Sequence, residues 1–344
     1  MPLPVALIID VEPDPRLFDR PEVSHWQGFH RMLELVARLR QQLRDLQQQP
    51  PSFAWLLRMD PQMRIVYGDG GWIAENFAKE LAGLREAGDE LGLHTHLYRQ
   101  LADGHTWITD TADPAWRRQC VLEATDTWRR IFGEPCLVHS FGDRSLYEDS
   151  LDVLEEAGIR VDLTPEPGLV SKSVYRPDEK LVGKLPDYSR APRELWRPAR
   201  GDFLRHDPLA GRDLWLLPVA TYRFPRYFEP GRRIDQVLRR ARGDLPSRDD
   251  ISQRYVRICL AQRGYVVRRG CALLMRQHAP NTLHFVLRCS QANSRATCER
   301  VADNVRWLAG GGLGRDIEFV SPLRLMDRLG VPRPCNPRTD AAVA

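Results

Sequence analysis

Hydrophobic residues occur along this chain in short unbroken runs, separated by longer stretches with helical spacing. Apolar runs at 5–9, 53–59, 90–93, 136–140 and 159–163 each end in polar side chains. Runs of this length, bounded by polar residues, predict strands buried on both faces of a sheet. Later runs at 214–219, 283–287 and 319–320 predict three more strands.

Helical spacing fills most of the intervals between these runs. Apolar residues three and four positions apart predict helices over 28–49, 74–87, 115–132, 148–157, 292–308 and 322–329. Strands that alternate with helices are typical of an α/β fold with a parallel sheet and helical crossovers. The alternation alone does not separate an open sheet from a barrel.

Two segments interrupt the alternation. Residues 165–213 are rich in Pro, Arg and Gly and predict an insertion loop, whereas residues 223–269 predict a small helical excursion. We expect both to belong to one domain over 1–330. Residues 331–344 are expected to form a disordered tail.

Composition removes several classes of partner. The 50 Lys and Arg residues nearly balance the 46 Asp and Glu residues, and no basic block suggests nucleic acid as a partner. No stretch approaches the roughly 20 apolar residues of a membrane span. The seven cysteines form no CxxC pair, which favours a reducing compartment. Together with an N-terminus unlike a secretory signal, this predicts a cytoplasmic protein.

Acidic and histidine residues follow two of the predicted strands. Asp10 and Glu12 follow the first strand, and His94 and His96 follow the third. Residues two positions apart in an extended segment point the same way, so each pair can reach one ion. The pattern predicts a metal site. Asp14 is an alternative ligand to Glu12, or a helix N-cap, and Asp60 either contacts substrate or metal or caps the second strand.

Longer motifs resemble a known family. The segments IIDVEPD, ELGLHTHLY and SFGDRSLYEDSLDVLEEAGIRVDLTPEPG are similar to the first three motifs of NodB-homology polysaccharide deacetylases, carbohydrate esterase family 4. PDYSRAPRELWRP and LWLLPVATYRF resemble a later loop and strand of the polysaccharide-biosynthesis branch, whose first motif can be Asp-x-Glu. The resemblance extends over residues 5–330. It implies a distorted (β/α)7-type barrel, a divalent metal that is usually Zn2+, and removal of an acetyl group from an N-acetylated sugar or polysaccharide precursor.

The resemblance also implies roles for particular residues. Asp10 would be the catalytic base, and Glu12, His94 and His96 the metal ligands. Arg144 would position the base through an ion pair. The expected contacts with the acylated sugar come from Asp60, Tyr98, Asp143 and Tyr222.

One expected residue of the family is missing. No histidine stands near positions 288–290, where the resemblance places a general acid. Arg288 is the candidate catalytic residue there, with His139, His278 and His284 as other possible proton donors. Arg288 could alternatively bind a carboxylate or phosphate of the substrate, or form a surface ion pair.

Two other functions compete with a deacetylase. Amidohydrolase and PHP-type metallohydrolases also use an HxH pair, although theirs usually lies near the first strand. A catalytically inactive sugar-binding barrel would explain the missing acid histidine. Metal content and turnover on acylated sugars distinguish these alternatives.

Overall fold

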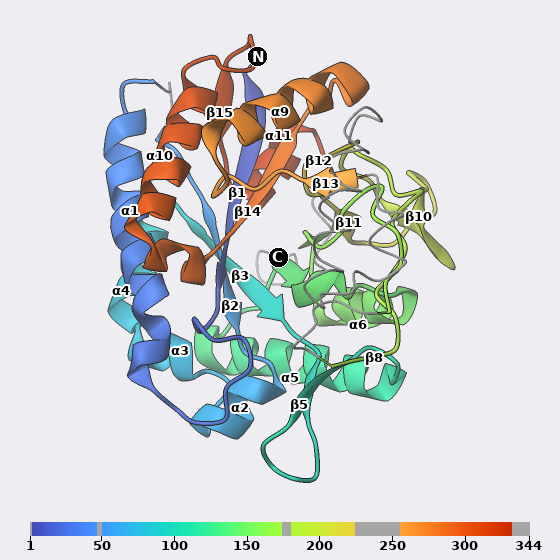
Figure 1. Ribbon diagram of the computed structural model, residues 1–344. Helices are drawn as coiled ribbons and strands as arrows, with labels where there is room; N and C mark the ends of the chain where they lie inside the picture. The colour runs from blue at the N-terminus through green and yellow to red at the C-terminus, as the bar shows by residue number, and fades with distance from the viewer. Residues whose placement is uncertain (1, 47–49, 174–179, 224–254, 332–344) are drawn as a thin grey trace, which may run out of the picture.

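A computed structural model describes residues 2–46, 50–173, 180–223 and 255–331 of the chain (Figure 1). Its centre is an eight-stranded parallel sheet in the order β11-β7-β6-β3-β2-β1-β14, with β15 paired to the first residues of β1. These strands are β1 (Leu3–Val11), β2 (Ala54–Arg58), β3 (Glu90–Thr95), β6 (Val138–Phe141), β7 (Val161–Asp162), β11 (Trp215–Leu216), β14 (Leu283–Arg288) and β15 (Ile317–Phe319). The α/β fold expected from the sequence is confirmed.

Helices cover the outer face of the sheet. They are α1 (Gln27–Leu43), α2 (Pro61–Tyr67), α3 (Trp72–Asn76), α4 (Ala78–Glu86), α5 (Pro114–Phe132), α6 (Glu148–Ala157), α9 (Gly264–His278) and α10 (Arg295–Ala309). Short 3-10 turns η1 (Val23–Trp26), η2 (Gly142–Arg144) and η4 (Cys289–Asn293) precede α1, α6 and α10. Figure 1 shows α1 and α10 side by side next to β1 and β14. No helix among the described residues is both long and apolar enough to span a membrane.

Successive side chains of the strands belong alternately to two apolar clusters, one on each face of the sheet. Val5, Leu7 and Ile9 of β1 pack outward with the helices, whereas Ala6 and Ile8 pack inside the curled sheet. The short helix α11 (Pro322–Arg328) adds Leu325 and Met326 to the inner cluster. Since side chains alternate along a strand, positions 10 and 12 continue the inner face that Ala6 and Ile8 begin. The inner face is therefore apolar at the base and polar at the carboxyl ends of the strands.

The curled sheet remains open along one seam. β11 and β14 are its two edges and share no strand pairing. A hydrogen bond from the Ala220 amide to the His284 carbonyl, 2.8 Å long, crosses between them. Next to this seam, β12 (Thr221–Arg223) and β13 (Tyr255–Arg257) form an antiparallel pair. The fold is thus a half-barrel that a few contacts close.

Several local predictions need correction. The segment 165–213, predicted as a loop, contains β8 (Leu181–Val182), β9 (Pro198–Ala199) and β10 (Asp202–His206). β8 pairs with β5 (Trp107–Asp110), which in turn pairs with β4 (Tyr98–Gln100). β8 and β9 have two residues each, too few positions to show an alternation, and the five residues of β10 are half-buried or exposed and have no apolar run.

The predicted helical excursion over 223–269 is only partly described. Residues 224–254 lie outside the described residues, as do 332–344 of the predicted tail. Residues 255–257 form a strand instead of a helix, and the helix that follows starts at Gly264. The helix predicted over 74–87 is two helices, α3 and α4, which meet at Phe77.

Candidate metal centre

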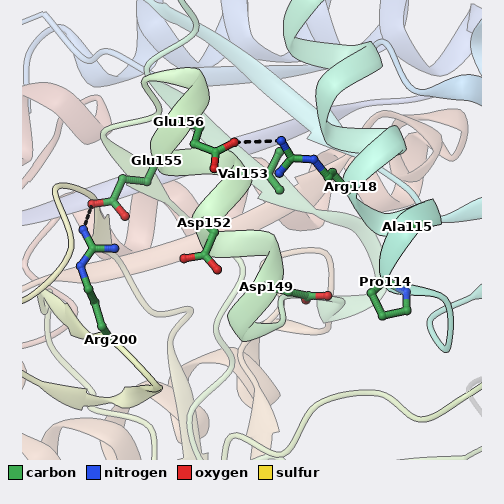
Figure 2. A pocket seen from close by; sticks show the side chains of 9 residues that line it. All are labelled: Pro114, Ala115, Arg118, Asp149, Asp152, Val153, Glu155, Glu156 and Arg200. Carbon is green, nitrogen blue, oxygen red and sulfur yellow. Dashed lines mark hydrogen bonds and ion pairs between the residues drawn. The ribbon is translucent and has the colours of Figure 1, made fainter.

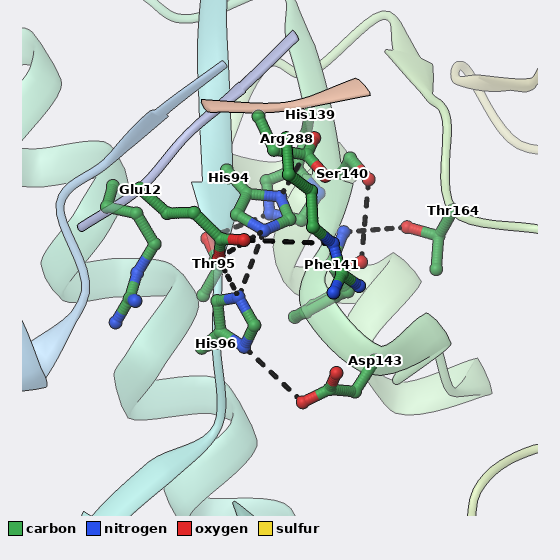
Figure 3. A network of polar contacts seen from close by, with 12 residues as sticks. Glu12, His94, Thr95, His96, His139, Ser140, Phe141, Asp143, Thr164 and Arg288 are labelled. Atoms are coloured by element: carbon green, nitrogen blue, oxygen red, sulfur yellow. Dashed lines mark hydrogen bonds and ion pairs between the residues drawn. The ribbon is translucent and has the colours of Figure 1, made fainter. Parts of the chain in front are cut away.

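Three side chains converge at the carboxyl ends of β1 and β3. The His94 and His96 Nε2 atoms lie 3.0 Å apart, and the Glu12 Oε2 atom lies 3.1 Å from His96 Nε2 and 3.8 Å from His94 Nε2 (Figure 3). All three residues are buried, and together they form a group that could hold a metal ion. The i, i+2 spacing in both segments brings them together as the sequence predicts.

The three donor atoms fit a divalent cation. Zn–N and Zn–O bonds of about 2.0–2.2 Å in a tetrahedron place neighbouring ligand atoms about 3.3 Å apart, close to the separations in this cluster. The Nδ1 atoms of both histidines, which point away from the cluster, are buried without a hydrogen bond. Each faces a carboxylate: Asp10 lies 3.6 Å from His94, and Asp143 lies 3.5 Å from His96. A carboxylate beside Nδ1 favours the tautomer whose Nε2 lone pair can bind a metal.

The protonation states suit metal binding. Burial, and next to it the charge of His96, holds the pKa of His94 well below its usual value. Burial opposes ionisation of Glu12, but its hydrogen bond with His96 and the charge of Arg288 lower its pKa on balance. A neutral His94 imidazole and an ionised Glu12 carboxylate need lose no proton when a cation binds.

Asp10 differs from Glu12 although both lie on one strand face. Burial and the negative charge of Glu12 raise the pKa of Asp10 to about 7. Its Oδ1 atom is buried without a hydrogen-bond partner. A carboxylate in this state can take up a proton near neutral pH, as a general base must.

Asp14 is not part of the cluster. Its Oδ2 atom accepts a hydrogen bond of 3.1 Å from the Gly28 amide at the start of α1. A methyl group at Gly28 would lie 2.2 Å from Asp14, so the helix end and this carboxylate fit closely. Asp14 is not the N-cap residue of α1, which is Trp26, but its carboxylate bonds the first turn of that helix from the preceding loop, and Glu12 is the acidic residue that meets the histidines.

The resemblance expected Arg144 to pair with Asp10, and the structure corrects this. No ion pair joins Arg144 to Asp10, both of which are described residues. Arg144 instead donates to the Val170 carbonyl at 2.8 Å, and the two side chains share only the lining of one small cavity. The charges that lower the pKa of Asp10 most are those of Arg288 and Arg257. Arg257, on β13, had no signal in the sequence.

Asp60 and Tyr98, two residues expected to contact the substrate, contact His96 instead. The Asp60 carboxylate accepts hydrogen bonds from Arg58, from the Gln62 amide and from the His96 amide, the last at 3.0 Å. The Tyr98 ring stacks on the His96 ring with centroids 4.5 Å apart. Asp60 and Tyr98 are almost fully buried, so in this structure they position His96.

Asp143 links the cluster to the loop after β1. Arg16 donates to both Asp143 oxygens at 2.6 Å, and this guanidinium lowers the pKa of Asp143 although burial opposes it. Gly142 precedes it, and a methyl group there would lie 2.1 Å from the His96 ring. Arg16 was missed in the sequence because its partner is 127 residues away.

The remaining candidate residues lie apart from the cluster. Tyr222 is buried against α9, where a methyl group at Gly270 would lie 2.9 Å from its ring. His139 is bonded on both ring nitrogens, to Asp162 at 2.7 Å and to Thr95 at 3.0 Å. His284 lies lower on β14 and its Nδ1 faces the Leu217 carbonyl, and burial lowers its pKa to about 3. His278 ends α9.

Known structures share this arrangement of strands and helices. A glycoside hydrolase/deacetylase from Parabacteroides distasonis superposes with a TM-score of 0.52 at 12% identity, over 98% of this chain and 73% of that one. A Pseudomonas aeruginosa protein, named with the polysaccharide deacetylases, superposes with a TM-score of 0.51 at 10% identity, over 96% of this chain and 92% of that one. The fold is the deacetylase barrel. The resemblance stated from the sequence motifs is confirmed at the level of the fold.

The other comparisons give no further information about function. No protein-family model matches the chain, and no curated protein matches it in sequence. A family 4 pseudoenzyme from Bacillus anthracis matches at 8% identity over 92% of this chain and 63% of that one. Its TM-score of 0.38 is too low to bear on whether this chain is active.

A wider hollow in the deacetylase barrel lies away from the strand ends. It has a volume of about 590 Å3 and is lined by acidic residues of α6 and by the start of α5 (Figure 2). Its carboxylates are already paired with arginines: Asp149 with Arg117, Asp152 with Arg212, Glu155 with Arg200 and Glu156 with Arg118. Carboxylates in such pairs form an ordinary solvated surface network. The candidate catalytic site is therefore the cluster at the strand ends and not this hollow.

Proposed function

We propose that this protein is a metal-dependent hydrolase that removes an acetyl group from an N-acetylated sugar or sugar-polymer precursor. The observation that carries the proposal is the convergence of Glu12, His94 and His96 beside Asp10, at the carboxyl ends of the strands of a deacetylase barrel. Function in parallel α/β barrels gathers at this end. Two imidazoles and a carboxylate favour Zn2+ among the common divalent ions.

The proposed reaction divides between the cation and the chain. A bound divalent cation supplies Lewis acidity to the acyl carbonyl and to the attacking water. Glu12, His94 and His96 would hold that cation, and Asp10 would accept the proton that water loses as it adds to the carbonyl carbon. The C–N bond then breaks, and Asp10 returns the proton to the leaving nitrogen. Water thus ends as part of acetate, and the sugar keeps a free amine.

Asp10 takes both proton steps because the histidines are placed elsewhere. His139 is held by Asp162 and Thr95, and His284 lies near the base of the inner face with its Nδ1 on a carbonyl. A single carboxylate that first accepts and then donates a proton needs a pKa close to neutral. In this chain the HxH pair lies at the end of β3 and the carboxylates at the end of β1. Amidohydrolase and PHP-type barrels instead have their HxH pair near the first strand, so this arrangement favours the deacetylase.

Metal analysis with matched variants tests the proposal. We expect about one zinc ion per parent chain, lost in Glu12→Ala and in the double variant His94→Ala, His96→Ala. Asp10→Asn should keep the metal and lose deacetylation of acetylated sugars by at least 100-fold, since it cannot move the proton. A parent protein that binds no divalent metal contradicts the proposal. Metal without turnover on any acetylated sugar would indicate a binding protein.

A further inference from the structure

A small cavity beside the metal-binding cluster is lined by three guanidinium groups. Arg144, Arg257 and Arg288 reach it from three separate elements, and its volume is about 30 Å3. Asp10 and His94 line the same cavity, so whatever enters it lies next to the reacting groups. A volume of this kind holds about two water-sized atoms, so only the charged oxygens of a larger substituent need enter it.

Arg144 has an unsatisfied donor at this cavity. The residue is 5% exposed, its Nη2 atom donates to the Val170 carbonyl, and its Nη1 atom is buried without a hydrogen bond. No ion pair is formed by Arg144 with any described residue, and the neighbouring Asp143 is occupied by Arg16 in a two-bond contact. A buried guanidinium without an anion is costly, because burial removes its hydration.

The backbone beneath Arg144 is also strained. Asp143 and Arg144 both have a φ of 54°, in the left-handed region that residues with a side chain rarely occupy. Two such residues in succession are uncommon, and strain of this kind gathers at ligand sites. The strained turn directs Asp143 to His96 and leaves Arg144 at the cavity.

Arg288 lies on the opposite side of the site. It is paired in register with Asp10 on the adjacent strand, and its Nε atom lies 3.7 Å from Glu12 Oε1 (Figure 3). Arg288 thus forms an ion pair with Glu12, and its side chain is 18% exposed, so its remaining N–H groups can also meet an incoming anion. Arg257 is engaged by Glu166 at 3.1 Å and adds positive potential.

We propose that the substrate carries a negatively charged substituent, a carboxylate or a phosphate, that binds between Arg144 and Arg288. This inference rests on the proposed deacetylase function and narrows its substrate to anionic acetylated sugars. A hydroxyl oxygen of a neutral sugar could accept from Arg144 but would leave its buried charge without a counter-ion, whereas an anion supplies that charge and accepts from both planar guanidiniums in the geometry that arginine favours. Arg288 thereby binds substrate at the position where the resemblance expected a general acid.

Direct binding to the full chain stripped of metal tests the anion site without turnover. Calorimetry with inorganic phosphate, glucuronate and glucose should show binding of at least one anion and none of glucose. The two anions distinguish a phosphate site from a carboxylate site. Arg144→Gln and Arg288→Gln should each weaken anion binding at least tenfold, whereas Arg118→Gln, at a surface ion pair, should bind like the parent.

Kinetics on the zinc-loaded protein separates this inference from the proposed function. The kcat/KM for N-acetylglucosamine 6-phosphate, or for an N-acetylated amino uronate, should exceed that for N-acetylglucosamine at least tenfold. Arg144→Gln should reduce this ratio, and Arg144→Lys should restore part of it. Equal turnover of charged and neutral sugars without anion binding overturns the inference and leaves the deacetylase. Anion binding without turnover of any acetylated sugar overturns the deacetylase alone.

Discussion

Gly142 leaves room for the imidazole that the metal-binding cluster needs. A methyl group at this position would lie 2.1–2.4 Å from three atoms of the His96 ring. The ring is held on its other side by Tyr98, so it has no place to move without leaving the cluster. The absence of a side chain at Gly142 therefore allows the His96 ring to occupy its position in the cluster.

Gly142→Ala is therefore expected to lower zinc affinity by about 10- to 100-fold, in the range seen when ligand support is lost. Competition with a chromophoric chelator measures the change. Gly83→Ala is the matched control, because Gly83 lies in α4 with open space where the methyl group would go. Equal zinc affinity in the two variants would show that His96 does not need this position.

The pairs Asp10 with Glu12 and His94 with His96 could be predicted because two positions of separation in a strand fix a common face. Arg16 could not be predicted, because its contact with Asp143 depends on two loops that meet only in the folded chain. The left-handed backbone at Asp143 and Arg144 likewise has no signal in residue type, since neither residue is a glycine.

At the scale of elements, β6 and β7 are joined by a buried hydrogen-bond chain behind the metal-binding cluster. Asp162 accepts from the Thr164 amide at 2.9 Å and bonds His139, which bonds Thr95 between the two cluster histidines. Asp162 and His139 have no exposed surface. The chain of bonds fixes the end of β3 from its outer face.

Asp162→Ala is expected to lower the free energy of unfolding by about 2–4 kcal/mol, because it leaves the buried Nδ1 atom of His139 and the buried Thr164 amide without partners. Urea denaturation measures the loss. Asp126→Ala removes an exposed carboxylate paired across 3.6 Å with Arg129 and should change stability by less than about 0.5 kcal/mol. Comparable losses in both variants would contradict the role of the buried chain.

Glu90 couples the start of β3 to α11 at the base of the fold. Its Oε2 atom accepts from the Leu323 amide at 3.2 Å, and its Oε1 atom is buried without a partner. Burial raises the pKa of Glu90 to about 7. The folded protein therefore holds this proton more tightly than the unfolded chain does.

The stabilising effect of protonated Glu90 is complete below the unfolded pKa near 4.5 and is lost as the pH rises through about 7. Glu90→Gln should thus stabilise the protein relative to the parent by about 1–3 kcal/mol more at pH 8 than at pH 5. Urea denaturation of both proteins at the two pH values measures the difference. A difference that is independent of pH would place the Glu90 pKa near its ordinary value.

The strands of the sheet were predictable as elements and the small strands around it were not. Runs such as 5–9 and 283–287 carry enough consecutive apolar residues to show burial on both faces. β8 has two residues and gains its pairing from β5, about 70 positions earlier in the chain. Pairing of this kind depends on the whole fold and leaves no local period.

For the whole molecule, a bound cation should stabilise the fold as well as take part in catalysis. The ligands come from β1 and β3, so the ion would join strands separated by about 80 residues of chain. At 100 times its dissociation constant, zinc should add about 2.7 kcal/mol to the free energy of unfolding and raise Tm by a few degrees.

A thermal melt with zinc and with a chelator checks this effect. The double variant His94→Ala, His96→Ala should melt at one temperature under both conditions. A parent protein whose Tm does not respond to zinc would contradict binding to the folded state.

The open seam between β11 and β14 is a place where chains with this fold can change in length. Residues inserted between these strands, outside the β12–β13 pair, disturb no ladder of the central sheet, because its two edges meet through isolated contacts such as the one from Ala220 to His284. An insertion between β1 and β3 would instead have to preserve a continuous run of paired residues. We therefore expect lineages of this barrel to gain and lose chain at the seam, where new segments border the arginine-lined cavity and can alter which sugars reach it.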